Sequence, residues 1–132
     1  IMGEYTHDVL LEIDGVKATK PDATFYLLAD FNAFATDLQK VKISTSQKLS
    51  ESLMVHPYHT AIVGGDSLVL ERTDYSARIA YVDYDGGKVY ENYKNQKPKT
   101  HSERTEFVVN NAPNTVGGIK MIARFFEDIK NQ

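Results

Sequence analysis

The sequence predicts a single α+β domain, with a small antiparallel or mixed sheet and helices packed against it. Two short segments, 24–30 and 76–84, concentrate or alternate apolar residues as strands do. Residues 113–129 instead repeat apolar side chains at three- and four-residue steps, the period of an amphipathic helix. A chain of 132 residues has the usual length of one domain, so these elements should share one core.

The first thirty residues predict a helix and two strands. A helix is expected from Ile1 to about Glu12, because apolar or small residues recur at steps of three and four at Met2, Tyr5, Thr6, Val9 and Leu10. Gly15 is a plausible end for that helix, and 16–19 predicts a short strand. Residues 24–30 are dense in aromatic and apolar residues and too short for a helix. We interpret 24–30 as a buried strand.

The middle of the chain predicts one helix and two strands. Hydroxyl side chains at 44–46 can cap a helix that begins at about Ser46 and cannot pass Pro57. Residues 60–63 predict a strand that ends at the glycine pair 64–65. The segment 76–84 is the clearest strand, with Ala77, Ile79 and Tyr81 on one face and Arg78, Ala80 and Val82 on the other.

The last third predicts a capped helix, a loop and a long helix. Asp85 can cap a helix that carries Val89, Tyr90 and Tyr93. From Lys94 to about Thr105 all periodicity is lost, so we expect a charged, solvated loop. The final helix should begin near Pro113 and cover the sheet with the residues Val116, Ile119, Ile122, Ala123, Phe126 and Ile129.

Composition excludes several classes of function. The formal charge of −3 and the pI near 5.8 give no broad attraction for nucleic acid or anionic membrane surfaces. The absence of cysteine excludes disulfides, a thiolate nucleophile and a cysteine-built zinc site. No apolar stretch is long enough to span a bilayer, and no signal peptide is evident, so we expect a cytoplasmic protein. The beginning Ile1-Met2 is unusual for a natural start and suggests a piece of a longer protein or a tagged chain.

Four patterns that might carry chemistry are weak. His56 and His59 are three residues apart, but Pro57 breaks the helix that would point both at one metal. The glycine-rich 64–67 lacks the lysine of a phosphate-binding loop and predicts a plain turn. No Gly-x-Ser-x-Gly motif supports a serine hydrolase. The basic stretch is more typical of solvated surface than of a docking site for an acidic partner (Lys94, Lys97, Lys99 and Arg104).

Three tyrosines and one arginine of the predicted strands are further candidates for a binding site. Three tyrosines that might stack a ligand alternate with aliphatic residues, which favours a place in the core (Tyr26, Tyr81 and Tyr84). Arg78 is harder to explain, because a guanidinium in an apolar strand costs free energy unless an anion or a carboxylate meets it. The partner could be an internal Asp or Glu or a bound ligand.

Four segments in order resemble the small domain of class I and II pyridoxal-phosphate aminotransferases: 21–27, 60–65, 77–81 and the closing helix through Phe125-Phe126. The resemblance covers nearly the whole chain. Ala23 stands where the family usually has glycine, Gly64 where it usually has proline, and the stretch from Lys94 to about Asn111 is longer than the family's ordinary connection.

The resemblance implies that residues 1–132 are the carboxy-terminal domain of an aminotransferase, without the large domain that binds pyridoxal phosphate. Arg78 then matches the arginine that grips the substrate α-carboxylate, and this chain alone should be inactive. The Schiff-base lysine, the acidic partner of the cofactor and its phosphate cup are expected in the large domain. Lys48 and the segment 110–114 only superficially match large-domain motifs.

The implied partners are an amino acid and a 2-oxo acid, the missing large domain and a second subunit of a homodimer. The substrate amino acid cannot be predicted, and a related lyase or decarboxylating synthase is a further possibility within the same cofactor family. The alternative from another class is a free-standing α+β binding or regulatory module, in which Arg78 pairs internally and the basic stretch meets a partner.

Overall fold

A four-stranded antiparallel sheet with the order β1-β2-β4-β3 lies at the centre of the computed structural model, which describes residues 1–22, 25–68 and 70–132, the Asp66 side chain excepted. The strands are β1 (Lys17–Ala18), β2 (Tyr26–Asp30), β3 (Val63–Gly64) and β4 (Ser76–Ala80). The pairing of β2 with β4 is the longest and runs from Tyr26 opposite Ala80 to Asp30 opposite Ser76. Strands β2 and β4 thus pair although β3 lies between them in the sequence.

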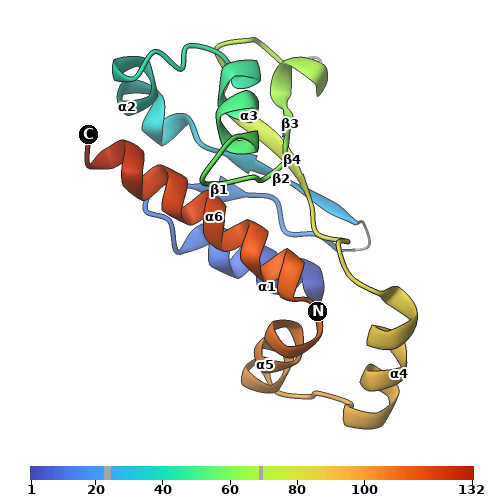
Figure 1. The fold of residues 1–132 in the computed structure, drawn as a ribbon. Coiled ribbons are helices and arrows are strands. Elements are labelled where there is room, and N and C mark those ends of the chain that lie inside the picture. Colours follow the sequence, from blue (N-terminus) through green and yellow to red (C-terminus); the bar gives the residue numbers. More distant parts are fainter. Residues whose placement is uncertain (23–24, 69) are drawn as a thin grey trace.

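Helices surround this sheet and account for most of the chain. Figure 1 shows α6 running in front of the strands, with α1 beside it and the pair α4 and α5 at one end of the molecule. Two short 3₁₀ helices span Asn32–Phe34 and Gly65–Leu68. The α-helices are α1 (Met2–Leu11), α2 (Ala35–Lys40), α3 (Ser46–Met54), α4 (Gly86–Gln96), α5 (His101–Asn111) and α6 (Pro113–Lys130).

The main core lies between one face of the sheet and the helices α1, α3 and α6. Four strand residues on that face are at most 3% exposed, namely Leu27, Ala29, Ala77 and Ile79. Phe126 of α6 stacks on Phe31 with ring centroids 4.5 Å apart and lies 4.7 Å from Phe34. Burying such rings contributes several kcal/mol each by area, roughly 25 cal/mol per Å². The predicted role of the last helix as the cover of the sheet is confirmed.

Side-chain caps confirm two of the predicted helix starts, whereas α1 ends at Leu11 with Glu12 as its C-cap, before the predicted stop at Gly15. Thr45 accepts a hydrogen bond from the Lys48 backbone and begins α3. Asp85 does the same for the backbone N–H of Lys88 at the start of α4. Gly15 has a φ of 88°, a conformation that glycine adopts without strain, and turns the chain after α1.

The predicted loop from Lys94 to about Thr105 is wrong. Helix α4 continues to Gln96, and α5 begins after four residues, so the stretch is a helical hairpin. Thr100 and Glu103 form a capping box, in which each side chain accepts a hydrogen bond from the other residue's backbone N–H. Phe107 and Val108 are then buried against α1 and α6. The apolar positions of α5 are few, which explains why periodicity did not reveal it.

The strands are shorter than predicted. The expected strand 60–63 is reduced to Val63–Gly64, and the expected strand 76–84 ends at Ala80. The strand 24–30 is not buried on both faces, because Leu27 and Ala29 face the core while Tyr26 is 37% exposed. Thr24 and the departure at Ala23 lie outside the described residues. Residues 31–43, for which the sequence predicted no element, contain a 3₁₀ turn and α2.

Candidate functional site: an arginine on the open sheet face

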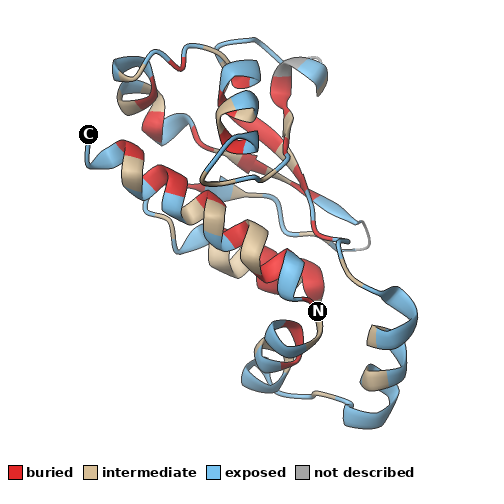
Figure 2. Ribbon diagram, in the orientation of Figure 1, coloured by how far each residue is buried: buried red, intermediate tan, exposed pale blue. Residues whose placement is uncertain are grey.

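The second face of the sheet, which carries Arg78 and is called the open face below, is less buried than the core face, Ser76 excepted. Directly opposed residues of antiparallel strands point to the same face, and Arg78 lies opposite Leu28 on one side and Val63 on the other. Leu28, Val63 and Arg78 are all half-buried, and Ala80 is exposed. Figure 2 marks the contrast between the buried core and the exposed surface. The predicted assignment of Ala77 and Ile79 to one face and of Arg78 and Ala80 to the other is therefore confirmed within β4.

The Arg78 guanidinium lies over the ring of Tyr26, with its central carbon 5.2 Å from the ring centroid. A cation over an aromatic face is attracted by about 0.5–2 kcal/mol, depending on how far it is removed from water. Tyr26 sits two residues along β2 from Leu28, so it is the diagonal neighbour of Arg78 across the strand pair. This contact places the Arg78 guanidinium against the Tyr26 ring.

Within the described residues, no carboxylate forms an ion pair with Arg78. Two other arginines do form ion pairs, Arg104 with Glu4 and Arg124 with Asp128. A half-buried guanidinium is suited to binding an anion, because its planar fork can give two parallel hydrogen bonds to a carboxylate. The internal partner that the sequence left open for Arg78 is not found in this part of the chain.

The sequence did not predict the contact between Tyr26 and Arg78. Two of the three tyrosines that it predicted for the core are not buried. Tyr26 is exposed on the open face, Tyr84 is half-buried, and Tyr81 alone is buried. Strand alternation around Leu27 and Ala29 could have placed Tyr26 on the outer face. Its position beside Arg78 depends on the register between β2 and β4, which sequence spacing does not give.

No protein-family model and no curated protein matches the chain. Any assignment of function therefore depends on the geometry around Arg78.

The two histidines of the weak metal motif do not form a site. The rings of His56 and His59 meet edge to face with centroids 5.7 Å apart, and both residues are exposed. In the described part of the chain, the only group of three potential metal ligands lies elsewhere, at Glu4, Asp8 and His101.

That cluster is explained by ion pairing between α1 and α5. Arg104 donates two hydrogen bonds to the Glu4 carboxylate, at 2.8 and 3.0 Å. The Arg104 bond lowers the pKa of Glu4, and the hydrogen bond from His101 lowers the pKa of Asp8. The cationic guanidinium already neutralises this group, so the cluster ties α5 to α1 instead of presenting an empty ligand set.

The basic stretch is divided by the helical hairpin. Lys94 pairs with Glu91 at 2.7 Å and lies over the Tyr90 ring, while Arg104 faces Glu4. Lys97 has a φ of 45° at the end of α4. Two of the four charges thus form ion pairs within the chain, and the stretch is not the charged, solvated loop that the sequence predicted.

The lysines of the chain lie on its surface. Every lysine is exposed, and Lys48 donates to Ser44 on the surface of α3 at 3.2 Å. The segment 110–114 forms the junction of α5 and α6. Among the described helices, none combines the length and apolar character required to cross a bilayer.

Proposed function

We propose that this chain is the carboxy-terminal small domain of a pyridoxal-phosphate aminotransferase, in which Arg78 binds the α-carboxylate of the substrate. The whole enzyme would transfer an amino group between an amino acid and a 2-oxo acid in the cytoplasm, as a homodimer. The observation that supports this function is the Arg78 guanidinium, placed on an open sheet face over Tyr26 without a carboxylate partner among the described residues.

The chemistry of Arg78 suits a carboxylate clamp. Two charge-assisted hydrogen bonds fix both the position and the direction of the substrate, and each contributes about 1.5–3 kcal/mol. Such orientation is a major part of catalysis, because it holds the α-carbon at the reacting centre. The sheet supplies rigidity, since Arg78 is paired on both sides by Leu28 and Val63. A lysine would keep the charge but lose the forked geometry.

The cofactor belongs to another part of the enzyme in this proposal. We expect the lysine that attaches the cofactor in the large domain, and the lysines of this chain are exposed. The small domain contributes the clamp and closes over the substrate, which excludes water from the site. The isolated chain should therefore bind carboxylates weakly and catalyse no reaction.

The test uses the full-length protein and amino-acid substrates. Replacing Arg78 by alanine should lower kcat/KM by about a hundredfold, because roughly 3 kcal/mol of clamp is removed. Arg78→Lys should recover only part of the loss. Pyridoxal phosphate should bind to a lysine of the full-length protein and to none in residues 1–132.

Arg72→Ala is the matched control. Arg72 is exposed, precedes β4 and forms no ion pair among the described residues, so its removal should leave kcat/KM unchanged. Equal activity of Arg78→Ala and Arg72→Ala would refute the clamp. Absence of any lysine-bound cofactor in the full-length protein would refute the aminotransferase assignment itself.

A further inference from the structure

The neighbours of Arg78 on the open face divide into an apolar side and a polar side. Directly opposite Arg78 are the aliphatic residues Leu28 and Val63. Its two diagonal neighbours on β2 are Tyr26 and Asp30, because each lies two residues from Leu28. The guanidinium lies over the Tyr26 ring, with its central carbon 5.2 Å from the centroid. Arg78 is therefore directed toward the apolar side of the face.

Asp30 lies on the polar side and is held by a contact of its own. Its carboxylate accepts hydrogen bonds from the backbone N–H and the side-chain amide of Asn32, at 2.8 and 2.7 Å. Asp30 lies opposite Lys17 on β1 and opposite Ser76 on β4. Charged and polar residues therefore gather on one side of Arg78. A ligand that extended from Arg78 toward this side would approach the Asp30 carboxylate.

The other side of Arg78 combines apolar surface with space. Ala80 lies two residues further along β4, roughly 7 Å from Arg78 by the rise of a strand, and is opposite Tyr26. Ala80 is exposed, and its side chain is a single methyl group. Phe25 meets the Tyr26 ring edge to face with centroids 5.2 Å apart and is 59% exposed. An apolar group attached to a carboxylate at Arg78 can therefore lie over Ala80 and against Tyr26.

Ala80 also borders a cavity of about 610 Å³. This volume is within the usual range of ligand sites, roughly 300–1,000 Å³. The described lining includes the apolar side chains of Ile79 and Met121, one histidine, His59, and no lysine or arginine. Asp83 is the one carboxylate among these residues. A second carboxylate on the ligand would therefore meet Asp83 without a lysine or an arginine to balance it.

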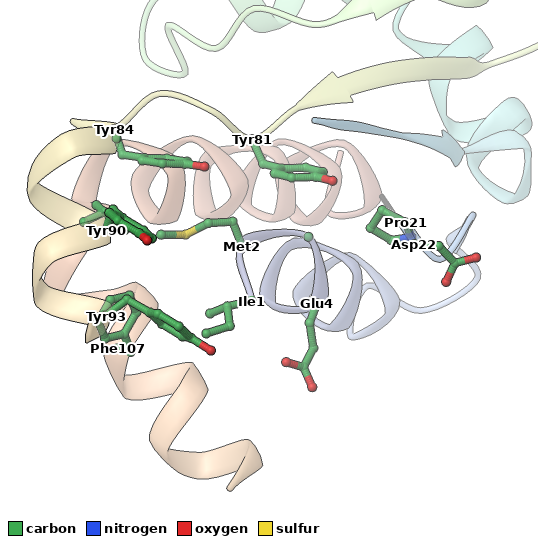
Figure 3. A pocket seen from close by; sticks show the side chains of 13 residues that line it. Ile1, Met2, Glu4, Pro21, Asp22, Tyr81, Tyr84, Tyr90, Tyr93 and Phe107 are labelled. Carbon is green, nitrogen blue, oxygen red and sulfur yellow. The ribbon is translucent and has the colours of Figure 1, made fainter. Parts of the chain in front are cut away.

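A second cavity, of about 500 Å³, is rich in aromatic side chains but does not suit a carboxylate. Figure 3 shows Tyr84, Tyr90 and Tyr93 on the side of this cavity next to α4, with Glu4 and Asp22 on the other side. None of the described residues that line it is lysine, arginine or histidine. An anionic ligand finds no cationic side chain in that lining, unlike at Arg78.

We infer that the ligand of Arg78 carries a single carboxylate and a bulky apolar body, which lies over Ala80 and against Tyr26. The inference rests on the proposed function, in which Arg78 binds the α-carboxylate of the substrate. It names the substrate class, namely large apolar amino acids and their 2-oxo acids. Dicarboxylic substrates are disfavoured, because Asp30 and Asp83 lie where a second negative charge would come.

Ligand binding to residues 1–132 tests this class without a cofactor. The chain is titrated with 3-phenylpropanoate, with its uncharged counterpart 3-phenylpropan-1-ol and with succinate, while the backbone amide signals are followed by NMR. 3-Phenylpropanoate should bind about tenfold more tightly than the other two, because it alone has one carboxylate and an apolar body. The signals of β2 and β4 should shift on binding.

Three variants locate the apolar body. Ala80→Lys places a cation where the body would lie, so the preference for 3-phenylpropanoate over succinate should disappear. Ser102→Lys is the control, because it adds the same charge at an exposed position of α5. Tyr90→Ala should leave binding unchanged, since the cavity beside α4 is not the site. An unchanged preference in Ala80→Lys, or loss of binding in Tyr90→Ala, would overturn the inference.

Kinetics of the full-length protein give a second readout. The value of kcat/KM should be about tenfold higher for phenylalanine than for aspartate, and Ala80→Lys should remove most of this difference. A parent enzyme that prefers aspartate would also overturn the inference.

The two proposals can fail separately. If Arg78→Ala abolishes the binding of 3-phenylpropanoate but the full-length protein holds no cofactor on a lysine, the aminotransferase is refuted and the ligand class is kept. If succinate binds as tightly as 3-phenylpropanoate and Arg78→Ala abolishes both, the clamp is kept and the apolar class is overturned. Failure of 3-phenylpropanoate to bind, or binding that survives Arg78→Ala, overturns the inference.

Discussion

At the scale of single residues, the candidate site consists of the Arg78 guanidinium over the ring of Tyr26 on one face of the sheet. Arg78 could be recognised from the sequence, since a charged residue interrupts an otherwise apolar strand. Tyr26 could not be assigned to it, because the diagonal contact depends on the register of β2 against β4. Sequence reasoning therefore found the charge of the candidate site and missed the surface that positions it.

Tyr26 should act as a positioning residue for Arg78. In the full-length protein, Tyr26→Ala should lower kcat/KM for amino acids by about 2- to 30-fold, which corresponds to a cation–π contact of 0.5–2 kcal/mol. Tyr26→Phe keeps the aromatic face and should restore most of the activity. An equal loss in both variants would show that the hydroxyl, not the ring, is what matters.

Tyr58 provides a second residue-scale prediction, on stability at high pH. Its hydroxyl donates to Asp128 at 2.6 Å, and desolvation together with this bond raises the pKa of Tyr58 to about 12. Because the pKa is raised in the folded state, the stabilisation is complete below the ordinary tyrosine pKa of about 10 and is lost as pH rises toward 12. Urea unfolding of this chain and of Tyr58→Phe should therefore show a steeper alkaline decline for the parent.

At the scale of elements, three helices begin at a side-chain cap, and the sequence predicted two of these helices, α3 and α4, but not α5. Thr45 and Asp85 precede clear apolar patterns, and the helices they begin were predicted. Thr100 and Glu103 have the spacing of a capping box, but α5 buries only Phe107 and Val108. The capping motif was the signal that could have revealed α5, because the apolar period of that helix is too sparse.

Removing the Thr100 cap should destabilise α5 locally. Thr100→Ala leaves the Glu103 backbone N–H without its side-chain acceptor, which typically costs about 1 kcal/mol. Hydrogen exchange in residues 101–111 should therefore be faster by about fivefold, in keeping with a loss of that size. Ser102→Ala is the control, since Ser102 is exposed in the same turn. Equal exchange in the two variants would contradict the role of the cap.

At the scale of the whole molecule, the fold class and the long covering helix were predictable from two periodicities. The order of the strands and the open face were not, because β2 and β4 are separated by more than forty residues of helices and loops. Short strands such as β1 and β3 carry too little pattern to determine partners. The candidate site depends on that undetermined topology, whereas the core does not.

Carboxylates held by ion pairs or hydrogen bonds in the fold predict acid sensitivity of the whole domain. Hydrogen bonds lower the pKa values of Glu4 and Asp8 at the contact of α1 with α5, and of Asp74 beside Asn32 and Ser76. A lowered folded-state pKa stabilises the fold above the ordinary carboxyl pKa of about 4, and this contribution is lost as pH falls. Unfolding free energy should decline below pH of about 4, and less steeply in Glu4→Gln. An identical acid decline in the variant would contradict the assignment.

The most direct test of the carboxylate clamp compares an amino acid with the amine that lacks its carboxylate. In the full-length protein, kcat/KM should favour the amino acid by about a hundredfold, as two charged hydrogen bonds imply. Arg78→Ala should remove most of that preference by lowering kcat/KM for the amino acid while leaving the value for the amine nearly unchanged. A preference that survives Arg78→Ala intact would contradict the assignment of Arg78 as the carboxylate-binding residue.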